Sequence, residues 1–190
     1  PIVPDIPGFG RSDFRGKMWS IRNAAKDMAL LLEHLSIGRV VVVGISMGGV
    51  IALQLALDYP KKTEKLILIN TFACLRPKHL NEMVYLISRF AIANLRGIHY
   101  QSHMVAQRLF PKAEQAELRQ ELIDRILASD PKVYKVAMRS LGMFNARARL
   151  SSIAVPTLVI SGAEDTTVAV KNQMELVRGI AGAKHIIVEE

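Results

Sequence analysis

The sequence has few of the features that mark disulfide-bonded or membrane-spanning proteins. Its single cysteine, Cys74, excludes an internal disulfide framework. It also has no run of about 18 or more apolar residues, because its most apolar stretch, 40–57, is interrupted by glycines, Ser46 and Gln54. We therefore expect no membrane partner and a cytoplasmic location.

Aromatic residues are scarce as well, at 6% of the chain, and the basic residues form no continuous run. The net charge of +8 would favour a nucleic-acid partner only if the basic residues formed a stripe with interleaved aromatics. Between Thr71 and Leu150 there are 13 Lys and Arg against 6 Asp and Glu, a net of +7 (13 − 6), and they are spread through helical patterns. We interpret them as solvated helix faces and expect no nucleic-acid partner.

The chain does have enough apolar sequence for one globular domain, with 190 residues of which 50% are hydrophobic. Short runs of Val, Ile and Leu alternate with helical patterns, which is typical of an α/β fold with a parallel sheet and helices on both faces. The predicted strands are Ile2–Asp5, Val40–Val43, Leu66–Ile69, Thr157–Ile160 and His185–Val188. The predicted helices are Ile21–Leu35, capped by Ser20, Met47–Asp58 and Val168–Gly179.

The stretch 77–144 interrupts this alternation, because it contains helical patterns and no convincing strand. Breaks near Gly97, Pro111 and Asp130-Pro131 indicate about four short helices. Such an insertion is either an ordinary covering layer or a cap over the site. We favour the cap, because a crossover does not need about seventy residues. We assign 1–70 and 151–190 to the core and 71–150 to the cap. Its predicted apolar inner face, which could equally be ordinary core, comprises Met83, Leu86, Ile87 and Phe90.

The pattern Gly44-Ile45-Ser46-Met47-Gly48 lies directly between a buried strand and a helix with small residues. A nucleophilic serine needs a sharp, strained turn that projects its hydroxyl from the sheet, and the two glycines remove side chains that would collide there. The backbone N–H of Met47 would lie at the start of the new helix, where an unpaired donor can serve as half of an oxyanion hole. The alternative is a tight glycine turn that contains an incidental serine.

With this motif the chain resembles the α/β-hydrolase superfamily, and the resemblance extends over strands four to eight of the family sheet. The loop Asp5-Ile6-Pro7-Gly8-Phe9-Gly10-Arg11-Ser12 looks like the family's turn after strand four. The segment 155–165 looks like its seventh strand and acid loop, in which the family position of the triad acid falls on Asp165. Glu164 is the second candidate for the acid. Asp165 could also simply cap the following helix.

The resemblance implies an ester, lactone or related acyl hydrolase that works through an acyl-enzyme on Ser46, with Asp165 orienting a histidine. The helical insertion and the segment 141–150 look most like small esterases, enol-lactone hydrolases and carbon–carbon bond hydrolases. No cofactor or metal is implied, and the expected partner is a small, apolar acyl substrate. An acyltransferase with the same nucleophile and a non-catalytic ligand-binding module are the alternatives.

Two functional elements of the family pattern would lie outside the 190 residues. The loop that supplies the second oxyanion donor would precede Pro1, and the catalytic histidine would follow Glu190. We therefore expect these 190 residues to be a fragment that is truncated at both ends and inactive by itself. None of its five histidines is expected to be the base; these are His34, His79, His99, His103 and His185.

Overall fold

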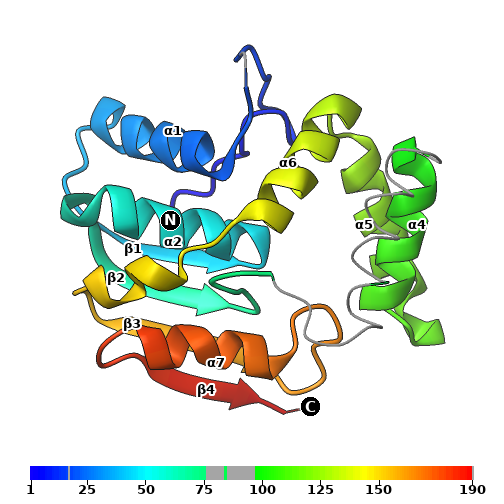
Figure 1. Ribbon diagram of the computed structural model, residues 1–190. Helices are drawn as coiled ribbons and strands as arrows, with labels where there is room; N and C mark the ends of the chain where they lie inside the picture. The colour runs from blue at the N-terminus through cyan, green and yellow to red at the C-terminus, as the bar shows by residue number, and fades with distance from the viewer. Residues whose placement is uncertain (17, 76–83, 85–96, 190) are drawn as a thin grey trace. The chain divides into compact units, whose positions relative to one another are not determined.

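A computed structural model describes residues 1–16, 18–75, 84 and 97–189 of the chain. The chain divides into two compact units, each described below by itself. The sheet unit comprises Ser20–Leu75 and Ser140–Glu190, and the helical unit comprises Pro1–Trp19 and Arg76–Arg139. Figure 1 labels the elements of both units.

The sheet unit is built on four parallel strands in the order β1-β2-β3-β4. Ile45 of β1 is paired with Ile69 of β2, which is paired in turn with Ile160 of β3, so these strands end close to the same level. The four predicted strands in this unit are confirmed, each at least as long as predicted. Their bounds are Val40–Ile45 (β1), Thr63–Ile69 (β2), Thr157–Gly162 (β3) and Lys184–Val188 (β4).

The predicted strand Ile2–Asp5 is wrong, because these residues form no strand. Pro1 and Pro4 have no amide N–H to donate to a neighbouring strand. Val3 is 89% exposed, so this short apolar run is not buried against a neighbour.

Helices connect the strands at nearly the predicted bounds. Helix α1 (Ile21–His34) begins at its expected cap, where the Ser20 hydroxyl accepts from the Asn23 N–H at 3.0 Å. Helix α2 (Met47–Asp58) has the predicted bounds, and the short 3-10 helix η1 (Pro60–Lys62) follows it. Helix α7 (Val170–Gly179) begins two residues later than predicted.

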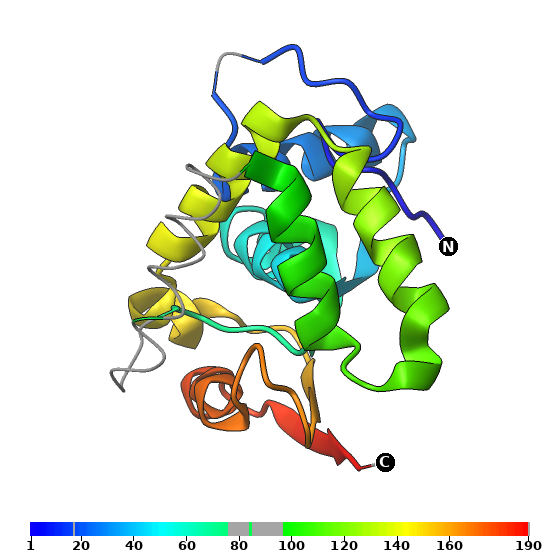
Figure 2. The same cartoon turned by 90° about the vertical axis from the view of Figure 1, so that its right-hand side faces the viewer.

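Helices α2 and α7 lie on one face of the sheet, whereas we expected helices on both faces. On β1, a side chain at Gly44 would overlap α2. On β3, the Ser161 hydroxyl is hydrogen-bonded to Gln173 of α7. The strand register places Gly44 and Ser161 on the same face of the sheet, the face that also carries Leu68 of β2. Figure 2 views the two helices nearly end-on beside the sheet. The reason is topological: the strands are added in one direction only, and right-handed crossovers then place both helices on the same side.

The opposite face of β1 carries large apolar side chains that are only partly covered. Val43 is 59% exposed and Ile45 is 62% exposed. β1 is also an edge strand of the described sheet, since its one neighbour there is β2.

The helical unit confirms the predicted breaks where it is described. Helix α4 begins at Gly97, Pro111 separates α4 from the next turn, and α6 begins at Pro131. The bounds are Gly97–Leu109 (α4), Ala113–Gln115 (η2), Ala116–Leu127 (α5) and Pro131–Met143 (α6, whose last four residues belong to the sheet unit). The predicted inner-face residues of the cap, Met83, Leu86, Ile87 and Phe90, lie outside the described residues. None of the described helices is both long and apolar enough to cross a membrane.

The loop 5–12 of the helical unit is the chain reversal that the sequence predicts. Gly8 (φ +86°) and Gly10 (φ +56°) have left-handed backbone conformations, which favour glycine. Asp5 closes the loop by accepting from the Arg11 backbone N–H at 3.0 Å. A Cβ at Gly10 would lie 2.5 Å from the Asp5 carboxyl carbon, so this closed form requires glycine there.

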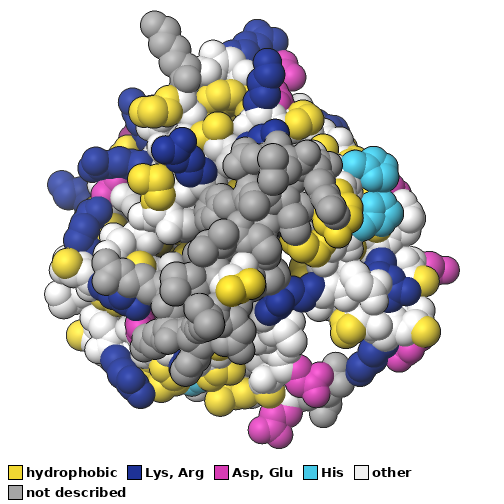
Figure 3. Space-filling model, turned by 45° about the vertical axis from the view of Figure 1, so that its right-hand side comes forward, with side chains coloured by type: hydrophobic (Ala, Val, Ile, Leu, Met, Phe, Trp, Pro, Cys, Tyr) yellow, Lys and Arg dark blue, Asp and Glu magenta, His cyan; other side chains and the backbone are white. Residues whose placement is uncertain are grey.

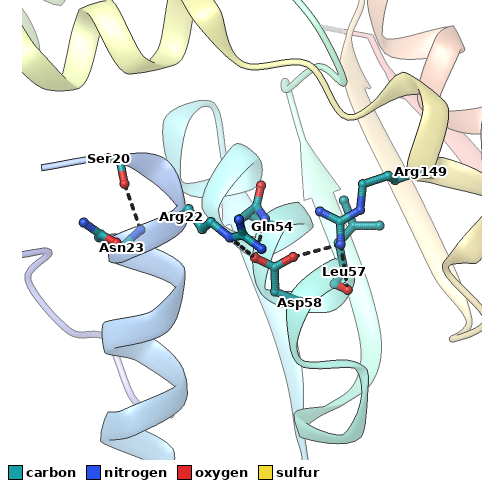
Figure 4. A network of polar contacts seen from close by, with 7 residues as sticks. All are labelled: Ser20, Arg22, Asn23, Gln54, Leu57, Asp58 and Arg149. Carbon is teal, nitrogen blue, oxygen red and sulfur yellow. Dashed lines mark hydrogen bonds and ion pairs between the residues drawn. The ribbon is translucent and has the colours of Figure 1, made fainter.

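Asp58, at the end of α2, joins three elements of the sheet unit (Figure 4). Its carboxylate accepts from Arg22 of α1 at 3.0 Å, from Gln54 of α2 at 2.6 Å and from Arg149 at 2.8 Å. Arg149 lies in the 3-10 helix η3 (Arg147–Ser152), which leads into β3. Burial alone would raise the pKa of Asp58, but the hydrogen bonds from Arg149 and Gln54 and the charges of both arginines outweigh it, so its pKa lies below the usual value.

We expect Asp58 to make the stability of the protein depend on pH. Because the folded-state pKa is lowered, the carboxylate stabilises the fold fully above its unfolded pKa of about 4, and this contribution is lost as the pH falls through the folded pKa. Asp58→Asn should lower the unfolding free energy near neutral pH by about 1–3 kcal/mol and by much less in acid. Urea denaturation of both proteins at several pH values measures this. Asp13→Asn, which removes an exposed ion pair with Arg15, is the control and should change little at any pH.

Candidate active site

Ser46 occupies the turn between β1 and α2 in a strained backbone conformation. Its φ of 50° and ψ of −118° are rare for a residue with a side chain. The side chain is exposed and does not cap α2 by a hydrogen bond. The hydroxyl is therefore held on a sharp strand-to-helix turn, which is what the glycine and serine pattern predicts.

Three hydrogen bonds hold the Ser46 backbone in this conformation. Its N–H donates to the Ile69 carbonyl at the end of β2 at 2.9 Å. Its carbonyl accepts from the Val50 N–H at 3.1 Å and from the Thr71 hydroxyl at 2.8 Å. Thr71 is completely buried, so the turn is fixed from the sheet side by a side chain 25 residues away.

The glycines around Ser46 do not all have the role that we predicted. A Cβ at Gly44 would overlap the Gly48 carbonyl oxygen, so this glycine is required for α2 to approach β1. At Gly48 a Cβ would meet no atom within 4 Å, so the predicted collision is wrong at that position. The second close approach is at Gly49, where a Cβ would lie 2.6 Å from Cβ of Thr71.

We expect Gly44→Ala to lower the unfolding free energy by about 1–3 kcal/mol or more, because the methyl group meets backbone atoms that cannot move away cheaply. Gly38→Ala is the matched control. It lies between α1 and β1, has open space around its Cβ position and should be neutral or slightly stabilising. Thermal or urea denaturation compares the two variants. Equal stabilities would contradict the close packing at Gly44.

Met47 is the first residue of α2. The first N–H groups of a helix have no partner within the helix, and the helix dipole adds partial positive charge there. The Met47 N–H is thus adjacent to the Ser46 hydroxyl at the helix end that favours a developing negative charge.

Asp165 lies in the loop after β3, three residues past Gly162. Its Oδ1 accepts from the backbone N–H groups of Thr167 at 2.7 Å and Val168 at 2.9 Å. Because α7 begins only at Val170, the carboxylate stabilises the turn before the helix and not the helix end itself. Within the described residues its Oδ2 has no hydrogen-bond partner. Glu164, the second candidate, is exposed and has no such contacts.

Ser46 and Asp165 follow strands that end at the same edge of the sheet, with β2 between them. Two strand spacings amount to about 10 Å. A histidine ring that bridges a serine hydroxyl and a carboxylate needs a comparable distance, namely two hydrogen bonds of about 3 Å plus the width of the imidazole. Asn70 directly follows β2, the strand between β1 and β3, and its Oδ1 accepts from the Gly162 N–H at 2.8 Å.

The histidines of the sheet unit lie away from this edge. His34 is in the last turn of α1, which leads into the amino end of β1. His185 is the second residue of β4, paired with Val159. His99 and His103 belong to the helical unit, and His79 lies outside the described residues.

His185 takes part in a buried polar network. The Ser161 hydroxyl donates to Gln173 Oε1 at 2.7 Å, so its 2.9 Å contact with His185 Nε2 requires that Nε2 carry the hydrogen. Gln173 in turn donates to the Val168 carbonyl at 2.8 Å. Ser161 and Gln173 are completely buried, so the network fixes the loop after Asp165 against β3.

Sequence reasoning missed the supporting residues Asn70, Thr71, Ser161 and Gln173. Asn70 has a positive φ of 45°, which asparagine tolerates better than most residues. An Asn directly after a buried strand was the one available signal. The other three act through hydrogen bonds between distant segments, which no local pattern reveals.

A parallel α/β sheet with a strained serine between strand and helix defines the α/β-hydrolase class of fold. The chain belongs to this family: the family model described as alpha/beta hydrolase fold matches residues 2–190.

Individual relatives agree with this membership. The chain is 28% identical to 3-oxoadipate enol-lactonase 2 of Acinetobacter baylyi over 173 residues, which cover 88% of this chain and 63% of that protein. The enol-lactonase structure from Burkholderia xenovorans LB400 has 26% identity and a TM-score of 0.84, covering 97% of this chain and 70% of that one. A hydrolase from Pseudomonas aeruginosa PA01 has 28% identity and a TM-score of 0.84, covering 97% and 69%. The chain thus spans less than two thirds of the length of the first of these relatives.

Proposed function

We propose that the protein containing these 190 residues hydrolyses an ester, a lactone or a related acyl substrate through an acyl-enzyme on Ser46. The single observation that carries the proposal is the left-handed Ser46 turn, with its exposed hydroxyl directly before α2. Such strain persists only where the surrounding structure enforces it, and it is concentrated at functional sites. Three backbone hydrogen bonds enforce it here.

In the proposed mechanism each residue has one role. The Ser46 hydroxyl attacks the acyl carbon, and its proton goes to a histidine, which gives it to the leaving oxygen as the acyl–oxygen bond breaks. A water molecule, deprotonated by the same histidine, then attacks the acyl-enzyme, and the acid product leaves with Ser46 restored. The Met47 N–H stabilises the oxyanion. Asp165 orients the histidine through Oδ2, while Oδ1 remains bound to the loop backbone. His185 is not proposed as this histidine, because its Nε2 donates to Ser161.

A lactone is the favoured substrate class within this proposal. Two similar proteins carry the name enol-lactonase, at 28% and 26% identity. Hydrolysis of a lactone releases no alcohol, because the leaving oxygen stays attached to the acyl group. The domain assignment also remains part of the proposal, with 71–150 as a cap that supplies an apolar wall to the substrate. The antiparallel bridge between Cys74 and Asn145 supports an insertion, because it brings the two ends of this segment together.

Fluorophosphonate labelling of the full-length protein tests the nucleophile directly. The reagent bonds covalently to an activated serine hydroxyl, and peptide mass spectrometry locates the modified residue. We expect modification at Ser46 alone, with none in the Ser46→Ala variant. Labelling at any other serine would overturn the assignment.

A further inference from the structure

Two histidines on α4 lie side by side on the surface of the helical unit. His99 and His103 are four residues apart, so they project from the same face of the helix. Their ring centroids are 5.1 Å apart, with 31° between the ring planes. Both side chains are exposed. Figure 3, in which histidine is cyan, shows histidine side chains gathered on the face that it draws. One helix carries both residues, so its own geometry determines their separation.

The separation of the rings matches the spacing of two imidazoles on one metal ion. A metal ion about 2.0–2.1 Å from each ligating nitrogen lies about 3.2 Å from each ring centroid. At a tetrahedral angle, two such centroids are about 5.2 Å apart. The observed 5.1 Å therefore agrees with the centroid separation that two imidazoles have on one ion.

Nothing in the described part of the chain competes for the two rings. Neither imidazole has a hydrogen-bond or ion-pair partner there, and the Ser102 hydroxyl donates to the backbone carbonyl of His99 and leaves the ring free. His99 lies near the start of α4, where the helix dipole opposes a cation, but this effect is weak at an exposed position.

We propose that His99 and His103 form a two-histidine site for a divalent first-row transition-metal ion. Imidazole nitrogen suits Cu²⁺, Ni²⁺ and Zn²⁺, and the affinities should follow the order in which Cu²⁺ binds most tightly. The described ranges contain no group of three or more His, Cys, Asp or Glu side chains able to hold a metal, so the site proposed from them has two protein ligands. The bound ion links the first two turns of α4. The site is independent of the hydrolase proposal.

Isothermal titration calorimetry with Cu²⁺, Ni²⁺ and Zn²⁺, at about pH 7.5, tests the site. We expect one ion per chain for the unmodified protein. His99→Gln and His103→Gln should each weaken binding by about 100-fold, because each variant keeps only one of the two imidazoles that bind the ion together. Glutamine keeps a polar side chain at an exposed position, so the fold should be unaffected, and circular dichroism checks this.

A displaced pair provides the decisive control. In the His99→Gln background, Gln107→His recreates a pair four residues apart with His103, on an exposed position of the same helix, and should restore binding. His34→Gln, which removes an isolated histidine from α1, should leave the affinity unchanged. The proposal is overturned if the unmodified protein does not bind, if either α4 substitution leaves the affinity unchanged, or if His34→Gln weakens binding equally.

Discussion

Ser46→Ala in the full-length protein is expected to lower kcat by about four to six orders of magnitude, because no other group can form the acyl-enzyme. Stability should hardly change. The hydroxyl is exposed and makes no helix-cap bond, and alanine tolerates the positive φ no worse than serine does. The backbone hydrogen bonds to Ile69, Val50 and Thr71 all remain. Hydrolysis of a model ester or lactone, measured with thermal denaturation, separates activity from folding.

Ser36→Ala is the matched control for this substitution. Ser36 also has a positive φ, 57°, and it lies in the loop between α1 and β1. The same loss of a hydroxyl from a left-handed serine should therefore leave activity unchanged. A Ser46→Ala protein that keeps more than a few percent of the activity would refute the nucleophile assignment.

Asp165→Asn is expected to lower kcat by about four orders of magnitude, with a much smaller effect on KM. The amide oxygen of asparagine can still accept from the Thr167 and Val168 N–H groups, so the loop keeps its shape. The side-chain NH₂ then replaces Oδ2 and would hold the histidine in the wrong tautomer. Steady-state kinetics on purified variants, with circular dichroism as a check on folding, measure the effect.

Asp130 offers a control with the same local chemistry. Its Oδ1 accepts from the backbone N–H groups of Lys132 and Val133, which lie two and three residues further along the chain. Oδ1 of Asp165 accepts from the residues at the same two spacings in its own loop. Asp130→Asn should leave kcat unchanged. Glu164→Gln tests the second candidate for the acid, and a larger loss from Glu164→Gln than from Asp165→Asn would reassign the role.

The sequence predicted those parts of the fold that local patterns determine. Apolar runs identified the four strands of the sheet unit, and Ser20 marked the start of α1. The run Ile2–Asp5 failed because an apolar run becomes a strand only when a neighbour supplies hydrogen bonds. The start of α7 was misplaced by two residues because the Asp165 side chain holds 167 and 168 in a separate turn.

The strained turn at Ser46 was predictable, because the glycine and serine pattern reflects a local backbone requirement. The structural reason for each glycine was not predictable, because it depends on which atoms of other segments lie next to that glycine. Gly48 faces open space, whereas Gly49 packs against Thr71 from another strand end. The network of Ser161, Gln173 and His185 joins residues up to 24 positions apart and leaves no local signal.

The exposed face and edge of β1 leave this strand able to pair with a further strand. Its six residues, Val-Val-Val-Val-Gly-Ile, combine high β-propensity with no charge and no proline, a composition typical of segments that form intermolecular β-structure. No lysine or proline within the strand discourages another strand from pairing with its edge. The strand that presents Ser46 therefore has a composition that favours pairing with a further strand, from its own chain or from another. A charged substitution at exposed Val43 should therefore reduce aggregation of the 190-residue chain.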